Sequence, residues 1–148
     1  MLEKEIKILF VFAVIFIVLF TYVKATSWND MSRMATIESV VERGTFAIDD
    51  SLYNETKDKV SVNGHFYSEK PVMFTLLSAI FYKGLYTIGI RFSNAEFIVY
   101  YTITLLTTGI SFLVLLYIIY KTLKLLNIKS HMLLLLLGVC ATPIIVRC

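Results

Sequence analysis

The sequence FIVYYTITLLTTGISFLVLLYIIY, residues 97–120, contains no charged side chain in twenty-four consecutive positions. A helix needs roughly 20 apolar residues to cross a bilayer core about 30 Å thick. Two further apolar runs cover residues 8–23 and 132–146. Hydrophobic residues make up 57% of the 148-residue chain and charged residues 17%, so the chain is more apolar than most soluble domains. The composition therefore predicts an integral membrane protein.

A weaker apolar run, residues 72–90, is interrupted by Lys83 and Gly84. If this run crosses the bilayer, the chain is an all-α membrane protein with about four transmembrane helices. Four crossings from a cytoplasmic start place the lysines that follow residue 120 outside, against the positive-inside tendency, and a re-entrant segment would remove that conflict. We favour four crossings because the run is long enough to span a bilayer.

The first apolar run follows a short charged head and precedes small residues at positions 25–27. A cleaved signal peptide is the alternative to a membrane anchor, but the run is longer than a usual signal core and the cleavage pattern is poor. We therefore expect a cytoplasmic head and first transmembrane helix in residues 1–24. An external, periplasmic loop is expected in residues 25–71, and further transmembrane helices in residues 72–148. The chain ends directly after an apolar run, and we expect it to be truncated.

The loop is predicted to begin with a helix. Ser27 to Asp30 resembles a capping box, with Asn29 or Asp30 as alternative caps, and Gly44 is a natural helix stop. Four apolar residues recur between them at helical spacing: Met31, Met34, Ile37 and Val41. Such a stripe is typical of a helix that lies along the membrane surface or of one that packs on neighbouring helices.

Residues 60–67, with the sequence VSVNGHFY, predict a short β-hairpin. Asn63 and Gly64 separate two β-prone runs, and both residue types tolerate the positive φ of a two-residue turn. In the register of such a turn, Val62 faces His65 and Val60 faces Tyr67.

The same register brings together charged residues at the base of the hairpin. Asp58 would lie close to Glu69 and Lys70. Pro71 follows at once and suits the first turn of the next apolar helix. The sequence therefore predicts a carboxylate and lysine cluster where the loop meets an apolar segment.

Several short motifs resemble, in their order, the N-terminal part of bacterial GT-C glycosyltransferases. After the apolar anchor they are NDMSR at 29–33, VERGT at 41–45, DK at 58–59 and GHFYSEKP at 64–71. The last motif is similar to the family's Tyr-x-(Glu/Asp)-Lys-Pro-Pro, with Val72 in place of the second proline. The resemblance covers essentially the whole chain. The family's proteins, which include protein O-mannosyltransferases and aminoarabinose transferases of lipid A, are several times longer.

The resemblance implies a membrane glycosyltransferase that transfers a sugar from a polyprenyl-phosphate donor outside the membrane. It implies Asp30 as the base or as the residue that orients the acceptor, and Asp58 is the other candidate for that catalytic role. The family often has two acidic residues where this chain has Asn29 and Asp30. The remaining candidates are Lys70 and Arg33 for the lipid phosphate, with Glu69, His65 and Tyr67 in support.

The residue types suit this chemistry. A hydroxyl that attacks a sugar carbon needs a carboxylate within hydrogen-bond reach to take its proton. The leaving phosphate develops charge near the membrane surface, where Lys70 is a compact cation. No Gly-rich phosphate loop, zinc-spaced Cys/His cluster or Gly-x-Ser-x-Gly elbow occurs in the sequence. The cofactor is unknown, and because no metal-ligand pattern occurs, His65 is interpreted as a hairpin surface residue.

The expected partners follow from this reading. They are membrane lipid, the polyprenyl-phosphate sugar donor and an unidentified acceptor that is a glycan, a lipid or a protein. The net charge of +3 comes without a basic stripe interleaved with aromatic residues, so nucleic acid is not expected. The expected location is the cell (inner) membrane, with several crossings. A small non-catalytic membrane accessory or assembly protein, whose external loop binds a partner, is the alternative function.

Overall fold

The computed structural model describes residues 2–21 and 23–126. They fall into two compact units, of which the first comprises residues up to Thr21 and from Thr108 onward. The second unit comprises the described residues of Tyr22–Thr107 and contains all the candidate site residues. In the first unit, helices α1 (Leu2–Phe20) and α5 (Ile110–Leu125) contact each other around the buried side chains of Ala13 and Leu116.

The second unit begins with α2 (Trp28–Glu38), and the predicted start of this helix is confirmed. Ser27 is the N-cap residue, and its Oγ accepts a hydrogen bond from the Asp30 N–H at 3.1 Å. The helix continues as a short π-helical segment, η1 (Ser39–Arg43), in which the backbone turn is wider than in an α-helix. Gly44 then ends it with a φ of 70°, in the left-handed region that glycine adopts easily.

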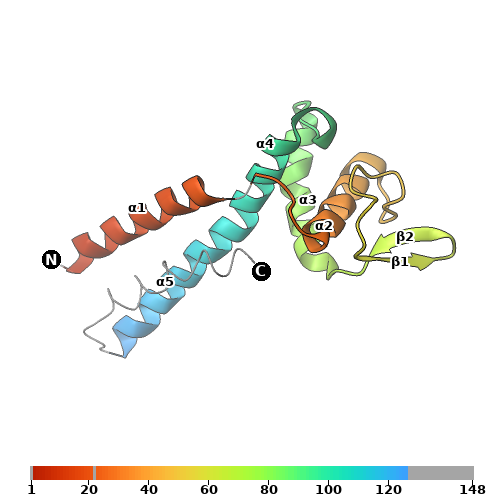
Figure 1. Cartoon of the computed structure of the whole chain (residues 1–148). Coiled ribbons are helices and arrows are strands. Elements are labelled where there is room, and N and C mark those ends of the chain that lie inside the picture. The colour runs from red at the N-terminus through yellow and green to blue at the C-terminus, as the bar shows by residue number, and fades with distance from the viewer. Residues whose placement is uncertain (1, 22, 127–148) are drawn as a thin grey trace. The chain divides into compact units, whose positions relative to one another are not determined.

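The apolar stripe of α2 and η1 is buried, so this helix packs on neighbouring helices. Met34, Ile37 and Val41 are at most 9% exposed. They share one core with residues of α3 (Val72–Thr87) and α4 (Phe92–Thr104), and α2 lies beside α3 in Figure 1. The other buried members of this core are Ala35, Ile48, Tyr53, Ala79, Tyr82, Phe92, Val99, Tyr100 and Ile103.

The predicted β-hairpin is present, with strands β1 (Lys59–Val62) and β2 (His65–Ser68) in antiparallel register. Asn63 has a φ of 53° and Gly64 a φ of 86°, as a two-residue turn requires. Figure 1 shows the two strands beside the N-terminal end of α3. The observed partners, Val62 with His65 and Val60 with Tyr67, confirm the predicted register.

Among the described residues, one helix is long and apolar enough to cross a bilayer. It covers Phe92–Leu125, 34 residues, and consists of α4, η2 (Leu105–Gly109) and α5 in succession. The shorter apolar helices are Phe10–Phe20 and Val72–Thr87. The 16 residues of α3 extend roughly 24 Å at 1.5 Å per residue, less than a bilayer core of about 30 Å.

The prediction of an all-α membrane protein with about four transmembrane helices is therefore wrong. The apolar side chains of residues 72–90 fall into two groups. One side of α3 joins the core of the second unit, and the rest of its surface stays exposed. The apolar run at 132–146 lies outside the described residues. The described chain is instead a mainly helical protein with a small two-stranded sheet and one candidate membrane span.

Candidate functional site

Three charged side chains meet at the base of the hairpin. Lys70 Nζ lies 2.9 Å from Asp58 Oδ2 and 3.0 Å from Glu69 Oε1. The Lys70 side chain is 17% exposed and that of Asp58 is 26% exposed, so the pair is partly shielded from water. The proximity that the hairpin register predicted for these three residues is confirmed.

A chain of hydrogen bonds ties both partners of this ion pair to α2. The Lys70 backbone N–H donates to Ser68 Oγ at 3.2 Å, and Ser68 Oγ lies 2.6 Å from Ser32 Oγ. Ser32 is fully buried and donates its single hydroxyl proton to the Asp58 carbonyl oxygen at 2.6 Å. Because that proton is used, Ser68 donates to Ser32. Ser32 thus fixes the backbone on both sides of the Asp58–Lys70 pair.

The charges of the pair stabilise each other. The pKa of Asp58 lies below its ordinary value of 3.8, mainly because the Lys70 ammonium donates a hydrogen bond to the carboxylate. Partial burial opposes this effect. The pKa of Lys70 is raised above 10.5 by the hydrogen bonds to Asp58 and then Glu69. Asp58 is therefore a carboxylate and Lys70 an ammonium at neutral pH.

This ion pair predicts a loss of stability in acid. A carboxyl whose folded pKa is depressed stabilises the fold above its unfolded pKa, and the contribution disappears as pH falls through the folded pKa. At pH 7 we expect Asp58→Asn to lower the denaturant midpoint, and we expect its difference from the unaltered protein to shrink between pH 5 and pH 3. Denaturant unfolding at several pH values measures this difference. A difference that stays constant down to pH 3 would contradict the assignment.

The other candidate base, Asp30, lies in the first turn of α2, away from the hairpin cluster. Its Oδ2 accepts a hydrogen bond from Ser27 Oγ at 2.9 Å, so the carboxylate takes part in the helix cap. Asp30 precedes Ser32 by two residues, which is a rotation of roughly 200° around the helix axis. Since Ser32 faces Asp58, Asp30 projects from nearly the opposite side of α2. The structure therefore separates the two candidate carboxylates.

Arg33 is exposed and forms no ion pair within residues 2–21 and 23–126. It does not join Lys70 in one cationic cluster. Arg33 and Asp30 are both close enough to Tyr100 of α4 to act electrostatically on its hydroxyl.

His65 and Tyr67 attach the hairpin to the preceding loop. His65 Nδ1 lies 3.2 Å from Asp49 Oδ2, while Asp49 Oδ1 accepts the Phe66 N–H at 3.1 Å. Tyr67 forms an isolated bridge with Ala47. These contacts support the hairpin but do not involve Lys70. The described part of the chain contains no group of three or more His, Cys, Asp or Glu side chains that could hold a metal ion.

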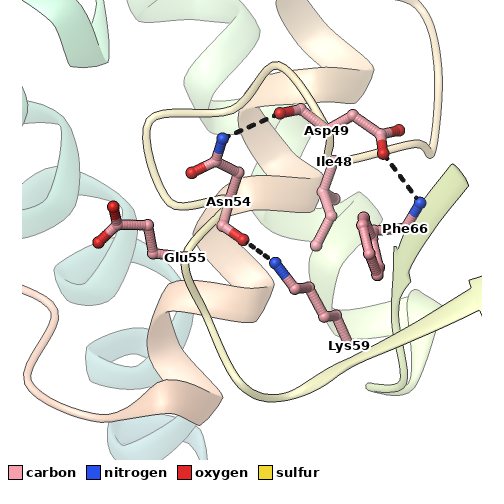
Figure 2. Close-up of a pocket in the computed structure, with 6 residues that line it drawn as sticks. All are labelled: Ile48, Asp49, Asn54, Glu55, Lys59 and Phe66. Atoms are coloured by element: carbon pink, nitrogen blue, oxygen red, sulfur yellow. Dashed lines mark hydrogen bonds between the residues drawn. The ribbon is translucent and has the colours of Figure 1, made fainter.

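A hollow of about 370 Å³ lies between the hairpin and the loop at residues 48–55, and Figure 2 shows the side chains that line it. Hydrogen bonds link three of its polar residues, Asp49, Asn54 and Lys59. Asn54 Nδ2 donates to the Asp49 carbonyl at 3.0 Å, and Lys59 Nζ donates to the Asn54 carbonyl. Lys59 also lies over the Phe66 ring, 4.6 Å from its centre. With these donors engaged, we assign the hollow a structural role.

Sequence reasoning missed a buried carboxylate on α2. Glu38 is 3% exposed, and its Oε1 lies 3.2 Å from Arg43 Nη1. Its Oε2 accepts hydrogen bonds from Ser51 Oγ at 2.7 Å and from the Leu52 N–H at 3.0 Å. Glu38 follows Met34 by four residues and precedes Val41 by three, so it lies on the apolar stripe. A carboxylate at that spacing was the signal that could have identified it.

A second missed contact connects η1 to α3 and α4. The Tyr82 hydroxyl donates to Glu42 Oε1 and accepts the Phe92 N–H at 3.1 Å. Tyr53 donates in a similar way to Glu96 Oε1 at 2.8 Å. Burial and the neighbouring Glu96 both raise the pKa of Tyr53, so it stays a neutral donor. These pairs hold the helices that carry the candidate site.

The hairpin cluster retains one unused donor. An ammonium has three N–H groups, and Lys70 uses one for Asp58 and one for Glu69. Its third N–H has no partner in the part of the chain that the structure describes. The arrangement can therefore present one strong donor to an external oxygen while both carboxylates keep the ammonium in place.

Comparisons with protein-family models, with curated protein sequences and with solved structures find no match to this chain.

Proposed function

We propose that this chain supplies the lipid-phosphate site of a membrane glycosyltransferase that transfers a sugar from a polyprenyl-phosphate donor on the external face of the membrane. The observation that carries the proposal is the Lys70 ammonium, held by Asp58 and Glu69 with one donor left over. Only Pro71 separates Lys70 from the apolar helix α3. A phosphate attached to a lipid tail needs this combination of a fixed cation and an adjacent apolar surface.

The reaction assigns a part to each charged group. The acceptor hydroxyl oxygen bonds to the sugar C1 while the bond between C1 and the phosphate oxygen breaks. The phosphate leaves with the electron pair and takes up the proton that the hydroxyl releases. Lys70 stabilises the charge that develops on this phosphate. Asp58 has a lowered pKa, which makes it a weak proton acceptor but a good hydrogen-bond acceptor for a hydroxyl. We therefore assign Asp58 to orienting the acceptor, and Asp30 stays the alternative base.

Donor binding tests the part of Lys70. We expect Lys70→Ala to weaken binding of a polyprenyl phosphate by about 10-fold or more, because a charge-assisted hydrogen bond contributes about 1.5–3 kcal/mol. Titration of the purified protein in neutral detergent measures the affinity. Lys59→Ala, on the same hairpin, is the matched control and should bind like the unaltered protein. Equal affinities for the Lys70 variant and the control would contradict the proposal.

Sugar transfer tests the carboxylates. Membranes that contain the intact protein are expected to lose turnover by about 100-fold or more in Asp58→Asn or in Asp30→Asn, with membrane insertion unchanged. The variant that loses turnover identifies the carboxylate on which transfer depends. Full activity in both variants would exclude this assignment.

A non-catalytic accessory protein is the second candidate function, and the outer edge of the hairpin favours it. Strand β1 is paired with β2 on one side, whereas β2 also contacts Ala47 on its other side. Val60 and Val62 of β1 are 42% and 50% exposed. An edge strand with exposed valines can accept a strand from a partner. This function would be supported if the unaltered protein binds a partner, the Val62→Lys variant does not, and neither protein transfers a sugar.

A further inference from the structure

An apolar groove runs between η1 and α3, outside the hairpin cluster. It has a volume of about 530 Å³, within the usual range of ligand sites. Aliphatic side chains form most of its wall: Val40, Val41, Leu76, Ala79 and Ile80. Gly84 also lines the groove, and a Cβ atom built at this position would meet no atom within 4 Å. The groove is therefore mainly apolar and has free space at Gly84.

Two cations lie beside a single aromatic ring, that of Tyr86. Lys83 lines the groove, and its Nζ lies 5.1 Å from the centre of the Tyr86 ring. The Arg91 guanidinium lies 4.7 Å from the centre of the same ring. Neither side chain forms an ion pair with a carboxylate in residues 2–21 and 23–126. The nearby Glu42 carboxylate is engaged by the Tyr82 hydroxyl. Two unpaired cations beside one ring attract an anion.

The outer surface of α3 is apolar as well. Met73, Phe74, Leu77 and Ile80 are between 44% and 81% exposed. Lys83 follows Ile80 by three residues, so the cation stands one turn beyond the exposed aliphatic surface. Because α3 extends only roughly 24 Å, it does not reach across a bilayer, and an interfacial position would place Lys83 at the level of the lipid headgroups.

We propose that the groove between η1 and α3 holds an acyl chain of an anionic phospholipid whose phosphate lies against Lys83 and Arg91. The aliphatic wall suits an alkyl chain, and the unpaired cations complement a negative headgroup. A zwitterionic lipid would bring its own cation towards two positive side chains and fit less well. The site is separate from Lys70, so it does not depend on the proposed glycosyltransferase function.

Lipid binding to the full chain in neutral detergent tests this proposal by native mass spectrometry. The probes are phosphatidylglycerol, phosphatidylcholine with identical acyl chains, a polyprenyl phosphate and inorganic phosphate. We expect phosphatidylglycerol to bind at least tenfold more tightly than phosphatidylcholine. The double variant Lys83→Gln with Arg91→Gln should remove that preference, and Gly84→Leu should weaken both phospholipids by filling the groove. Lys57→Ala is the matched control, because Lys57 lies 5.4 Å from the Trp28 ring centre and is not among the residues that line this groove.

Each other result overturns the proposal. Equal binding of the two phospholipids, or an unchanged preference in the double variant, would show that Lys83 and Arg91 do not recognise the headgroup. Competition by inorganic phosphate with no effect of Gly84→Leu would leave an anion site without an acyl chain. Preferential binding of the polyprenyl phosphate, lost in the double variant, would assign the groove to the sugar donor. The double variant alters exposed side chains, so the test does not depend on Gly84→Leu folding normally.

Discussion

Replacing Glu38 by alanine is expected to lower the free energy of unfolding by about 3 kcal/mol. The carboxylate is 3% exposed and accepts hydrogen bonds from Ser51 and from the Leu52 backbone. Its removal leaves these two donors and the Arg43 guanidinium without their partner. Because Ser51 and Leu52 belong to the loop that leads to the hairpin, the loop should also detach from α2 at lower denaturant concentration.

Denaturant unfolding in detergent micelles measures this effect. Glu38→Gln keeps the shape and one acceptor, so it should cost less than Glu38→Ala. Glu55→Ala is the matched control, because Glu55 is exposed and has no hydrogen bond among the described residues, and it should stay within about 0.5 kcal/mol of the unaltered protein. If Glu38→Ala unfolds like Glu55→Ala, the buried carboxylate does not hold the loop.

Replacing Tyr82 by alanine is expected to cost about 4 kcal/mol, a value typical of large aromatic side chains in a core. Tyr82 is fully buried, and its ring centre lies 4.7 Å from that of Phe92. Its hydroxyl links Glu42 of η1 to the first backbone N–H of α4. The single side chain therefore joins three helical segments, and its loss opens a cavity and frees two polar partners.

Tyr82→Phe separates the two contributions. It keeps the ring and removes the hydroxyl, so we expect a cost of about 1–2 kcal/mol. Denaturant unfolding, followed by the loss of helical structure, compares the free energies of unfolding of both variants. A cost for Tyr82→Phe as large as that for Tyr82→Ala would show that ring packing contributes little, against this expectation.

The hairpin, the start of α2 and the end of η1 could be predicted from the sequence because their causes are local. Asn63 and Gly64 determine the turn, and the turn determines every strand pair down to Lys59 with Ser68. This register leaves Asp58 close to Lys70 at the base of the hairpin. The Ser27 hydroxyl caps the start of α2 by accepting the N–H of Asp30. Gly44 ends η1 because it adopts a positive φ. The hairpin cluster was therefore predictable, although its attachment to α2 through Ser32 was not.

The membrane spans and the buried acids could not be predicted, because both depend on distant partners. An apolar run looks the same whether it faces lipid or a protein core, and in α3 the core side is defined by η1 and α4. Helix α4 begins at Phe92, five residues before the uncharged run that starts at Phe97, and the Phe92 N–H donates to the Tyr82 hydroxyl. The partners of Glu42 and Tyr53 lie about forty residues away in the sequence.

The π-helical segment η1 gives this region one residue that the helix can lose. One turn there contains an additional residue compared with an α-helix, so deleting a single residue of Ser39–Arg43 would convert the segment into regular α-helix and leave the later positions on nearly the same side. An additional residue in regular α-helix would instead rotate every later position by about 100° relative to α2. Such an insertion would turn Glu42 away from Tyr82. Natural variants of this protein should therefore tolerate the loss of one residue in η1 better than an insertion into α2.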